Sequence, residues 1–112
     1  MAWLLRDGEV LASLEVCGSA RSRARGLLGR DGVEGAVLLR PASSVHTFGM
    51  RFPIDVAHCT RDLIVLHTAT MARNRLALPH WRARAVLEAE AGSFARWGLA
   101  PGQQLEVSGD AP

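Results

Sequence analysis

One short apolar stretch, residues 43–56, holds the residues best suited to chemistry. It contains a histidine, an arginine and an aspartate, interrupted by a flexible glycine and a rigid proline: His46, Gly49, Arg51, Pro53 and Asp55. Imidazole can donate or accept a proton near neutral pH, and guanidinium binds carboxylate or phosphate through paired hydrogen bonds. The stretch completes no catalytic or metal-binding motif. It therefore indicates a candidate ligand-binding site without naming a reaction.

Arginine supplies every basic side chain, and its distribution along the chain is uneven. The chain has 13 arginines, no lysine and a formal net charge of +2. Two segments, residues 19–30 and 71–84, each carry four arginines and no acidic residue. The absence of lysine also fits a GC-rich coding bias, although arginine is the residue that binds planar anions in a bidentate manner. If the fold brings both segments beside Arg51, they form an electropositive mouth that we expect to bind a small anionic molecule or an acidic peptide.

Two other classes of function use the same residues. The first is a small hydrolase-like enzyme in which His46 acts as acid or base and Arg51 holds the anion. A serine nucleophile at Ser43 or Ser44 would lack the Gly-x-Ser-x-Gly context of the hydrolase elbow. The second is a protein-assembly or scaffold domain without a ligand, which would show an exposed apolar patch. Whether the chain is an enzyme stays open at this point.

Metals, cofactors and nucleic acid are not predicted. The histidines are scattered without metal-ligand spacing, so we expect no metal and no cofactor: they are His46, His58, His67 and His80. Trp81 lies among arginines, as in proteins that stack single-stranded bases. The chain has no tyrosine and little net charge, so nucleic acid is not an expected partner. A protein partner and the oligomeric state stay open.

The pattern of apolar runs predicts a small, mainly β (α+β) single domain over residues 1–112. Asp7-Gly8 can turn a hairpin between residues 3–5 and 10–14, the second strand running on to about residue 17. Residues 35–39 are apolar on both faces, as in a central strand. Further extended segments are expected at residues 45–50, 54–60, 63–70, 85–89 and 105–107. About seven short strands favour a closed or half-closed β-barrel-like fold.

Two short helices and one long loop complete the prediction. Ser19 can cap a helix over residues 20–28, and Gly98 can end a helix over residues 94–97 that Ser93 caps. Residues 71–84 lose periodicity and predict a long loop, where binding residues often lie. Period-2 alternation from Ile54 places Asp55 on the opposite side of its strand from Ile54 and Val56.

Cysteine and hydropathy patterns indicate the compartment. Cys17 and Cys59 form no C-x-x-C pair, so we expect buried thiols and no disulfide between them. The apolar N-terminal run breaks after four residues, and no later run is long enough to span a bilayer. We therefore expect a soluble, cytoplasmic protein without a membrane segment.

Five blocks of the chain, in this order and spacing, resemble one conserved family. They are residues 24–30, 35–39, 46–56, 86–92 and 98–102. The chain resembles the uncharacterised bacterial and archaeal family called domain of unknown function 192. The resemblance covers nearly the whole chain and implies a compact β-rich single domain with no established activity.

The central block departs from the family's usual Phe-Trp-Met-Lys-Asn-Thr and Pro-Leu-Asp. Gly49 stands where the family has tryptophan, the Asn-Thr pair is missing, and Gln103 replaces a usual aspartate. The ligand or its geometry could differ accordingly in this chain. The candidate ligand-binding residues are Arg25, His46, Thr47, Gly49, Met50, Arg51, Asp55 and Glu88.

The charged positions that match the family have two interpretations. Arg25, Arg51, Asp55 and Glu88 could bind a ligand. Alternatively, Asp55 could pair with Arg25 or Arg51 as a structural ion pair, because a buried carboxylate is costly without a partner. The sequence does not choose between these interpretations.

Overall fold

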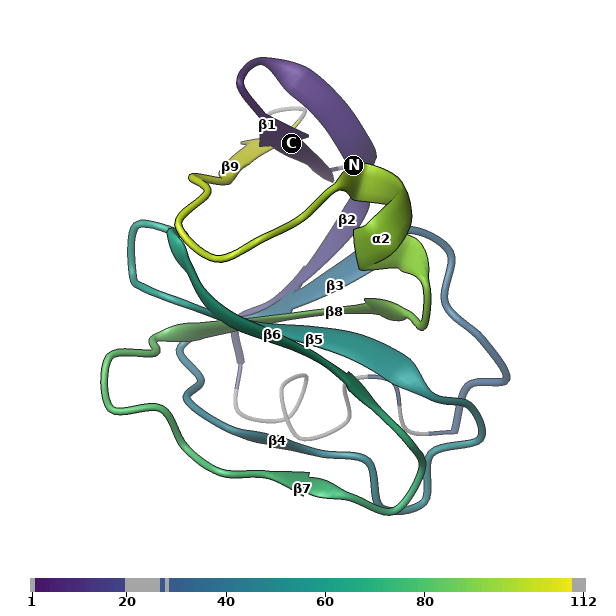
Figure 1. Ribbon diagram of the computed structural model, residues 1–112. Coiled ribbons are helices and arrows are strands. Elements are labelled where there is room, and N and C mark those ends of the chain that lie inside the picture. Colours follow the sequence, from purple (N-terminus) through teal and green to yellow (C-terminus); the bar gives the residue numbers. More distant parts are fainter. Residues whose placement is uncertain (1, 20–26, 28, 110–112) are drawn as a thin grey trace.

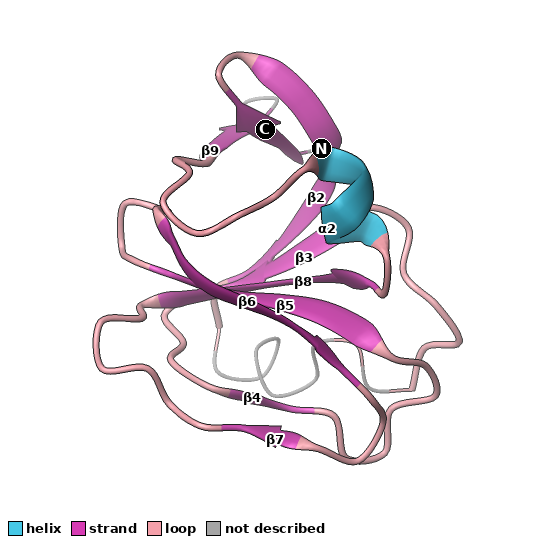
Figure 2. Ribbon diagram, in the orientation of Figure 1, coloured by secondary structure: helices cyan, strands magenta, loops and turns pink. Residues whose placement is uncertain are grey.

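The computed structural model describes residues 2–19, 27 and 29–109. The strands are β1 (Ala2–Arg6), β2 (Glu9–Cys17), β3 (Ala36–Leu39), β4 (Val45–His46), β5 (Ile54–Cys59), β6 (Val65–Met71), β7 (Leu76–Ala77), β8 (Ala85–Glu90) and β9 (Glu106–Gly109), and the described helix is α2 (Ser93–Trp97). The mainly β class is therefore confirmed (Figure 2). The helix predicted over residues 20–28 lies outside the described part of the chain, apart from Leu27. Among the described segments, no helix is long and apolar enough to cross a membrane.

Seven of the described strands form one mixed, open sheet in the order β6-β5-β8-β3-β2-β1-β9. The β2–β3 pair is parallel and the other pairs are antiparallel. The prediction of a closed barrel is wrong for the described chain, because closure would need a ladder between the edge strands β6 and β9. The segments beside those edges share one isolated bridge, Ile64 with Gln104, and backbone hydrogen bonds that join Val65 to Gly102 and Gln103, before β9 turns away to pair with β1.

The predicted hairpin and central strands are confirmed. Asp7 and Gly8 have positive φ angles of 52° and 79°, the geometry of a tight two-residue hairpin turn. All residues of β3 and β5 are buried, because apolar side chains cover both faces of the sheet there. The predicted end of α2 is also confirmed, since Gly98 takes up a left-handed φ of 63° after Trp97.

Two layers cover the two faces of the sheet (Figure 1). We call the side covered by α2 the helix face. Its core cluster includes Leu38, Ala57, Leu87 and Phe94. The opposite side is the ribbon face, because the two-stranded β4–β7 ribbon lies across it. Its cluster is built from other side chains of the same strands, among them Val37, Ile54, Val56, Met71 and Val86.

The ribbon joins two segments that lie far apart in the sequence. Val45 pairs with Ala77, and His46 pairs with Leu76. The predicted loop at residues 71–84 thus contains a two-residue strand, and its partner is the stretch that sequence analysis singled out. The ribbon leaves room for a pocket between itself and the β5–β6 hairpin.

Candidate functional site

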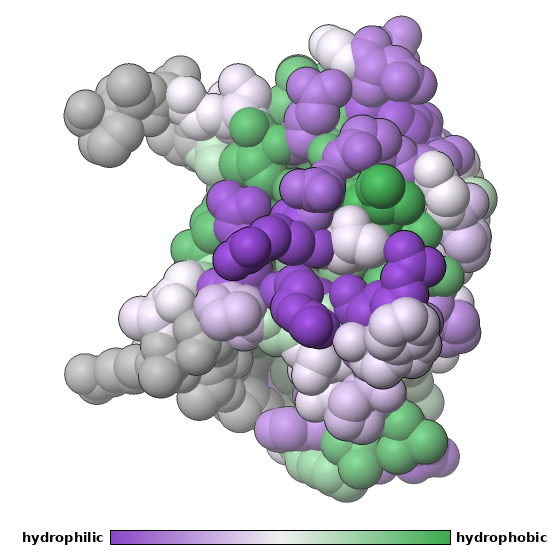
Figure 3. All heavy atoms as spheres, turned by 90° about the vertical axis from the view of Figure 1, so that its left-hand side faces the viewer, coloured by the Kyte–Doolittle hydropathy of each residue, from purple (hydrophilic) through white to green (hydrophobic). Residues whose placement is uncertain are grey.

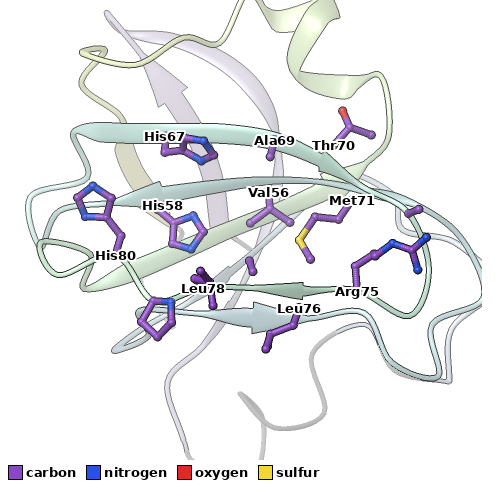
Figure 4. A pocket seen from close by; sticks show the side chains of 13 residues that line it. Val56, His58, His67, Ala69, Thr70, Met71, Arg75, Leu76, Leu78 and His80 are labelled. Atoms are coloured by element: carbon purple, nitrogen blue, oxygen red, sulfur yellow. The ribbon is translucent and has the colours of Figure 1, made fainter.

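A pocket of about 630 Å³ lies between the ribbon face of β5–β6 and residues 72–80 (Figure 4). Its described lining is Val56, His58, His67, Ala69, Thr70, Met71, Ala72, Arg75, Leu76, Ala77, Leu78, Pro79 and His80. Most of these side chains are apolar, and the polar ones are three imidazoles, one guanidinium and the hydroxyl of Thr70, which points away from the pocket and binds Asp55 on the helix face (Figure 4). A mainly apolar cavity with a few polar groups is the usual form of a small-molecule site.

His58 is the polar group that distinguishes this pocket. Its residue is only 5% exposed, yet neither Nδ1 nor Nε2 has a hydrogen-bond partner among the described residues. Burial lowers the pKa of His58, and the neighbouring His67 and His80 lower this pKa further. The imidazole is thus held neutral, with one N–H donor and one nitrogen acceptor unused. Buried polar groups are nearly always paired, so an unpaired one at a pocket wall points to a ligand.

Two further imidazoles lie on the same side of the pocket (Figure 4). The His67 ring meets the His58 ring edge-on, with centroids 6.1 Å apart. His80 accepts a hydrogen bond at Nδ1 from the Arg82 N–H, 3.1 Å away, which leaves Nε2 to carry the proton of the neutral ring. The two rings therefore add polar ring nitrogens near His58.

Arg75 lies apart from the three imidazoles in the same lining (Figure 4). One nitrogen of its guanidinium donates to the Arg73 and Asn74 carbonyls at 3.5 and 3.2 Å, and no bond within the described residues uses the other two nitrogens. No aspartate or glutamate is among the described lining residues. The electrostatic character of the pocket is therefore neutral to positive.

The predicted centre, residues 46–50, builds the ribbon instead of lining this pocket. Thr47 is fully buried: its hydroxyl donates to the Ala72 carbonyl at 2.7 Å and accepts from the Arg75 N–H at 2.8 Å. Gly49 has a φ of 77° and donates to Asn74 Oδ1 at 3.1 Å. Met50 is buried in the core of the ribbon face. These residues hold the segment that forms the pocket wall.

Two other predicted residues of this stretch, His46 and Arg51, lie at the surface. His46 is exposed, and its ring stacks on Phe48 with centroids 5.4 Å apart. Arg51 donates to Asp31 at 2.7 Å, and both side chains are more than half exposed. The structure therefore does not place His46 or Arg51 in the pocket, and the enzymatic alternative that uses them stays a prediction.

Asp55 lies on the helix face, as its alternation with Ile54 and Val56 predicted. The carboxylate is buried and accepts from Thr70 Oγ1 at 2.6 Å and from the backbone N–H groups of Gly92 and Phe94 at 2.9 and 3.0 Å. The last two groups belong to the start of α2, where the predicted cap at Ser93 is wrong: Gly92 is the N-cap residue, and the helix has no side-chain cap of its own. Pairing of Asp55 with Arg51 is wrong, because Arg51 binds Asp31 and neutral donors satisfy Asp55.

Glu88 lies on the ribbon face, between Val37 and Val56 of the neighbouring strands. Its Oε1 is buried and has no hydrogen-bond partner in the described part of the chain, and burial raises the pKa of Glu88 to about 7 against the opposing effect of Arg30. Glu88 does not line the described pocket. The predicted Arg25 lies outside the described residues, so its pairing with Asp55 is not described.

The predicted electropositive mouth does not form as a single surface among the described arginines. Arg30 and Arg51 are each bound to a carboxylate, of Glu15 and Asp31 respectively, at 2.8 and 2.7 Å. From the segment at residues 71–84, Arg75 reaches the pocket, whereas Arg84 lines a different hollow. Arg75 is therefore the arginine found in the described lining of the histidine pocket.

His58 and His67 are the site residues that sequence reasoning missed. They face one another across the β5–β6 hairpin because a register shift between His58 and Cys59 aligns His58 with His67. Without that shift, the register of the Cys59–Val65 pair would bring His58 opposite Leu66. The available signal was the alternation that places His58 on the same face as Val56.

The described residues are not arranged for metal binding or for catalysis by a thiolate. Within that part of the chain, no group of three or more His, Cys, Asp and Glu side chains is arranged to hold a metal ion. Both cysteines are buried as predicted, and burial raises the pKa of the Cys59 thiol to about 12. Cys59 packs on the helix face, away from His58, so it cannot act as a thiolate nucleophile beside that imidazole.

Comparison with solved structures places the fold among known ones. A protein of unknown function from Novosphingobium aromaticivorans DSM 12444 is 22% identical, with a TM-score of 0.75 over 94% of this chain and 82% of that one. A "putative transcription regulator" from Sinorhizobium meliloti 1021 is 20% identical, with a TM-score of 0.78 over 95% and 91%. At these identities the likeness shows the fold alone.

Family comparison agrees with the blocks noted in the sequence. No curated protein matches the chain. Residues 2–107 match DUF192, described as "Uncharacterized ACR". The match covers the described strands from β1 to the start of β9, including the pocket. The chain therefore belongs to the DUF192 family.

Proposed function

We propose that this chain is a binding protein for a small organic anion with an apolar body. The ligand lies in the pocket between the β5–β6 hairpin and residues 72–80. The observation that carries the proposal is the buried, unpartnered imidazole of His58 in a mainly apolar wall.

The chemistry of the wall selects the ligand class. Apolar side chains such as Val56, Met71 and Leu78 favour a hydrocarbon body. A carboxylate on that body can accept from the unused N–H of His58 and lie in the positive field of Arg75. A cationic group would find no carboxylate in the described lining and would lose its hydration without compensation.

The test is isothermal titration calorimetry of the full chain with three ligands of one length: octanoate, octanol and octylamine. We expect octanoate to bind most tightly and octylamine to bind least. His58→Leu should weaken octanoate binding about 10-fold or more, since a hydrogen bond to a charged group contributes about 1.5–3 kcal/mol. His46→Leu is the matched control, because His46 is exposed and outside the pocket.

A second pair of variants tests the positive charge. Arg75→Gln should weaken octanoate binding about threefold and leave octanol binding unchanged, because Arg75 is exposed and its field is screened by solvent. Arg73→Gln removes an equal charge two residues away, outside the described lining. Equal binding of octanoate and octylamine, or equal losses in His46→Leu and His58→Leu, would contradict the proposal.

A further inference from the structure

Three arginines line a second hollow, of about 570 Å³, at one end of the main sheet. Its described lining is Arg40, Pro41, Arg61, Arg84 and Ala85. This lining shares no residue with the histidine pocket. Any ligand bound here would therefore occupy a separate site.

The strand order explains why these arginines meet. The neighbours β5, β8 and β3 lie side by side, and β8 is antiparallel to both of the others. The start of β8 therefore lies beside the ends of β3 and β5. Arg40 follows β3, Arg61 follows β5 by two residues, and Arg84 directly precedes β8. The topology thus places three positive charges at one sheet end.

The charges of this hollow are not neutralised within the described chain. Among the described residues, ion pairs join Arg30 to Glu15 and Arg51 to Asp31, and neither pair includes an arginine of the hollow. Its described lining has no aspartate or glutamate. Strongly hydrophilic side chains gather on the face that shows the left-hand side of Figure 1 (Figure 3). Three like charges in one hollow repel one another and favour a multiply charged anion.

The backbone around the hollow is held in place before any ligand binds. The Arg84 N–H donates to the Cys59 carbonyl at 2.9 Å, and the Arg84 carbonyl accepts from the Ala42 N–H at 3.0 Å. The Arg84 guanidinium donates to the carbonyls of Trp81 and Ala83 at 3.1 and 2.8 Å. These bonds use one nitrogen of the guanidinium, so its remaining N–H groups stay available. A fixed donor loses less freedom when an anion binds.

We propose that the hollow at Arg40, Arg61 and Arg84 is a binding site for a phosphate group. The paired N–H donors of guanidinium match the geometry of phosphate oxygens, and the double negative charge of phosphate can interact with several guanidinium groups at once. The group can arrive as inorganic phosphate or on a small organic phosphomonoester.

The test follows the melting temperature of the full chain with inorganic phosphate, glycerol phosphate or sodium chloride at matched ionic strength. Both phosphates should raise the melting temperature saturably, and sodium chloride should not. If glycerol phosphate gives the lower dissociation constant, the organic ester is the source of the group; if inorganic phosphate does, the free ion is.

Variants connect the effect to the hollow. Arg40→Gln with Arg61→Gln should raise the phosphate dissociation constant at least 10-fold, and both side chains are exposed, so the fold should persist. Arg73→Gln with Arg96→Gln is the control with equal charge loss elsewhere. No saturable shift, equal losses in the two double variants, or tighter binding of a single-stranded oligonucleotide than of both phosphates would overturn the proposal.

Discussion

The two faces of the main sheet treat buried polar groups in opposite ways. On the helix face, the Asp55 carboxylate accepts three hydrogen bonds and joins β5 to β6 and to the start of α2. On the ribbon face, three residues further along β5, neither ring nitrogen of His58 has a hydrogen-bond partner within residues 2–19, 27 and 29–109. Within the same residues, Glu88 on this face leaves one buried carboxyl oxygen without a partner.

This contrast separates architecture from function. A fully satisfied buried group stabilises the fold, whereas an unsatisfied one lowers stability and persists where another constraint keeps it. Asp55 therefore belongs to the framework of the fold. His58 lines a pocket and is therefore the better candidate for ligand binding. Glu88 does not line that pocket, and its effect should be to make the free energy of unfolding depend on pH.

The largest expected effect is the loss of Asp55. Asp55→Ala leaves the N–H groups of Gly92 and Phe94 and the Thr70 hydroxyl without their acceptor. We expect the free energy of unfolding to fall by about 3–4 kcal/mol, measured by urea denaturation. Asp55→Asn keeps one acceptor oxygen and should cost less. An Asp55→Ala protein as stable as the wild type would remove Asp55 from the framework.

Glu88 should make stability fall as pH rises. Its folded pKa of about 7 lies above the ordinary value of 4.5, so the folded state binds the proton more strongly between these values. The free energy of unfolding should therefore decrease by about 3 kcal/mol from pH 4.5 to above pH 7. Glu88→Gln should abolish this decrease, as followed by urea denaturation at several pH values.

The control for this prediction is Glu90→Gln on the same strand. Glu90 is exposed, so its removal should leave the pH dependence unchanged. Equal changes in the two variants would show that burial of Glu88 is not the cause.

His58 should act in the opposite direction. The folded pKa of His58 lies below the ordinary 6.5, so the folded state disfavours the protonated imidazole. The free energy of unfolding is therefore unaffected by this group above pH 6.5 and falls as pH drops below that value. His58→Leu should remove this acid loss and raise the free energy of unfolding by about 1 kcal/mol at pH 7. Thermal unfolding at pH 5 and 7 measures both effects. A destabilised His58→Leu protein would place His58 in the framework with Asp55.

The smallest stability effect is expected at the outer wall of the pocket. Leu78 is 77% exposed, so Leu78→Ser should change the free energy of unfolding by no more than about 0.5 kcal/mol. The same variant should weaken octanoate binding in calorimetry, because Leu78 lines the pocket. Unchanged octanoate affinity would contradict binding in the pocket beside the ribbon.

Local patterns in the sequence predicted much of the framework. Asp7-Gly8 predicted the hairpin, and the apolar run at residues 35–39 predicted β3. Alternation predicted that Asp55 lies on the other face of the sheet from Ile54. Each of these features depends on backbone rules that act over a few residues. The closed barrel was wrong because closure depends on pairing between β6 and β9, which no local pattern encodes.

The sites depended on long-range contacts that the sequence does not display. His58 meets His67 only because a bulge shifts the β5–β6 register. Arg40, Arg61 and Arg84 meet only because β8 inserts between β5 and β3. Chemical composition drew attention to residues 43–56, but Thr47 and Gly49 in that stretch hold the ribbon instead of forming the pocket.

Ligand binding on the ribbon face is tested most directly by titrating the ¹⁵N-labelled protein with octanoate and following the amide chemical shifts. We predict saturable shifts at residues 56–58, 67–72, 75–78 and 80, with little change at Gly92 and Phe94 on the helix face. His58→Leu should raise the octanoate concentration needed for these shifts about 10-fold or more. Saturable shifts centred on α2, or no saturable shifts at all, would contradict the assignment of the ribbon face to ligand binding.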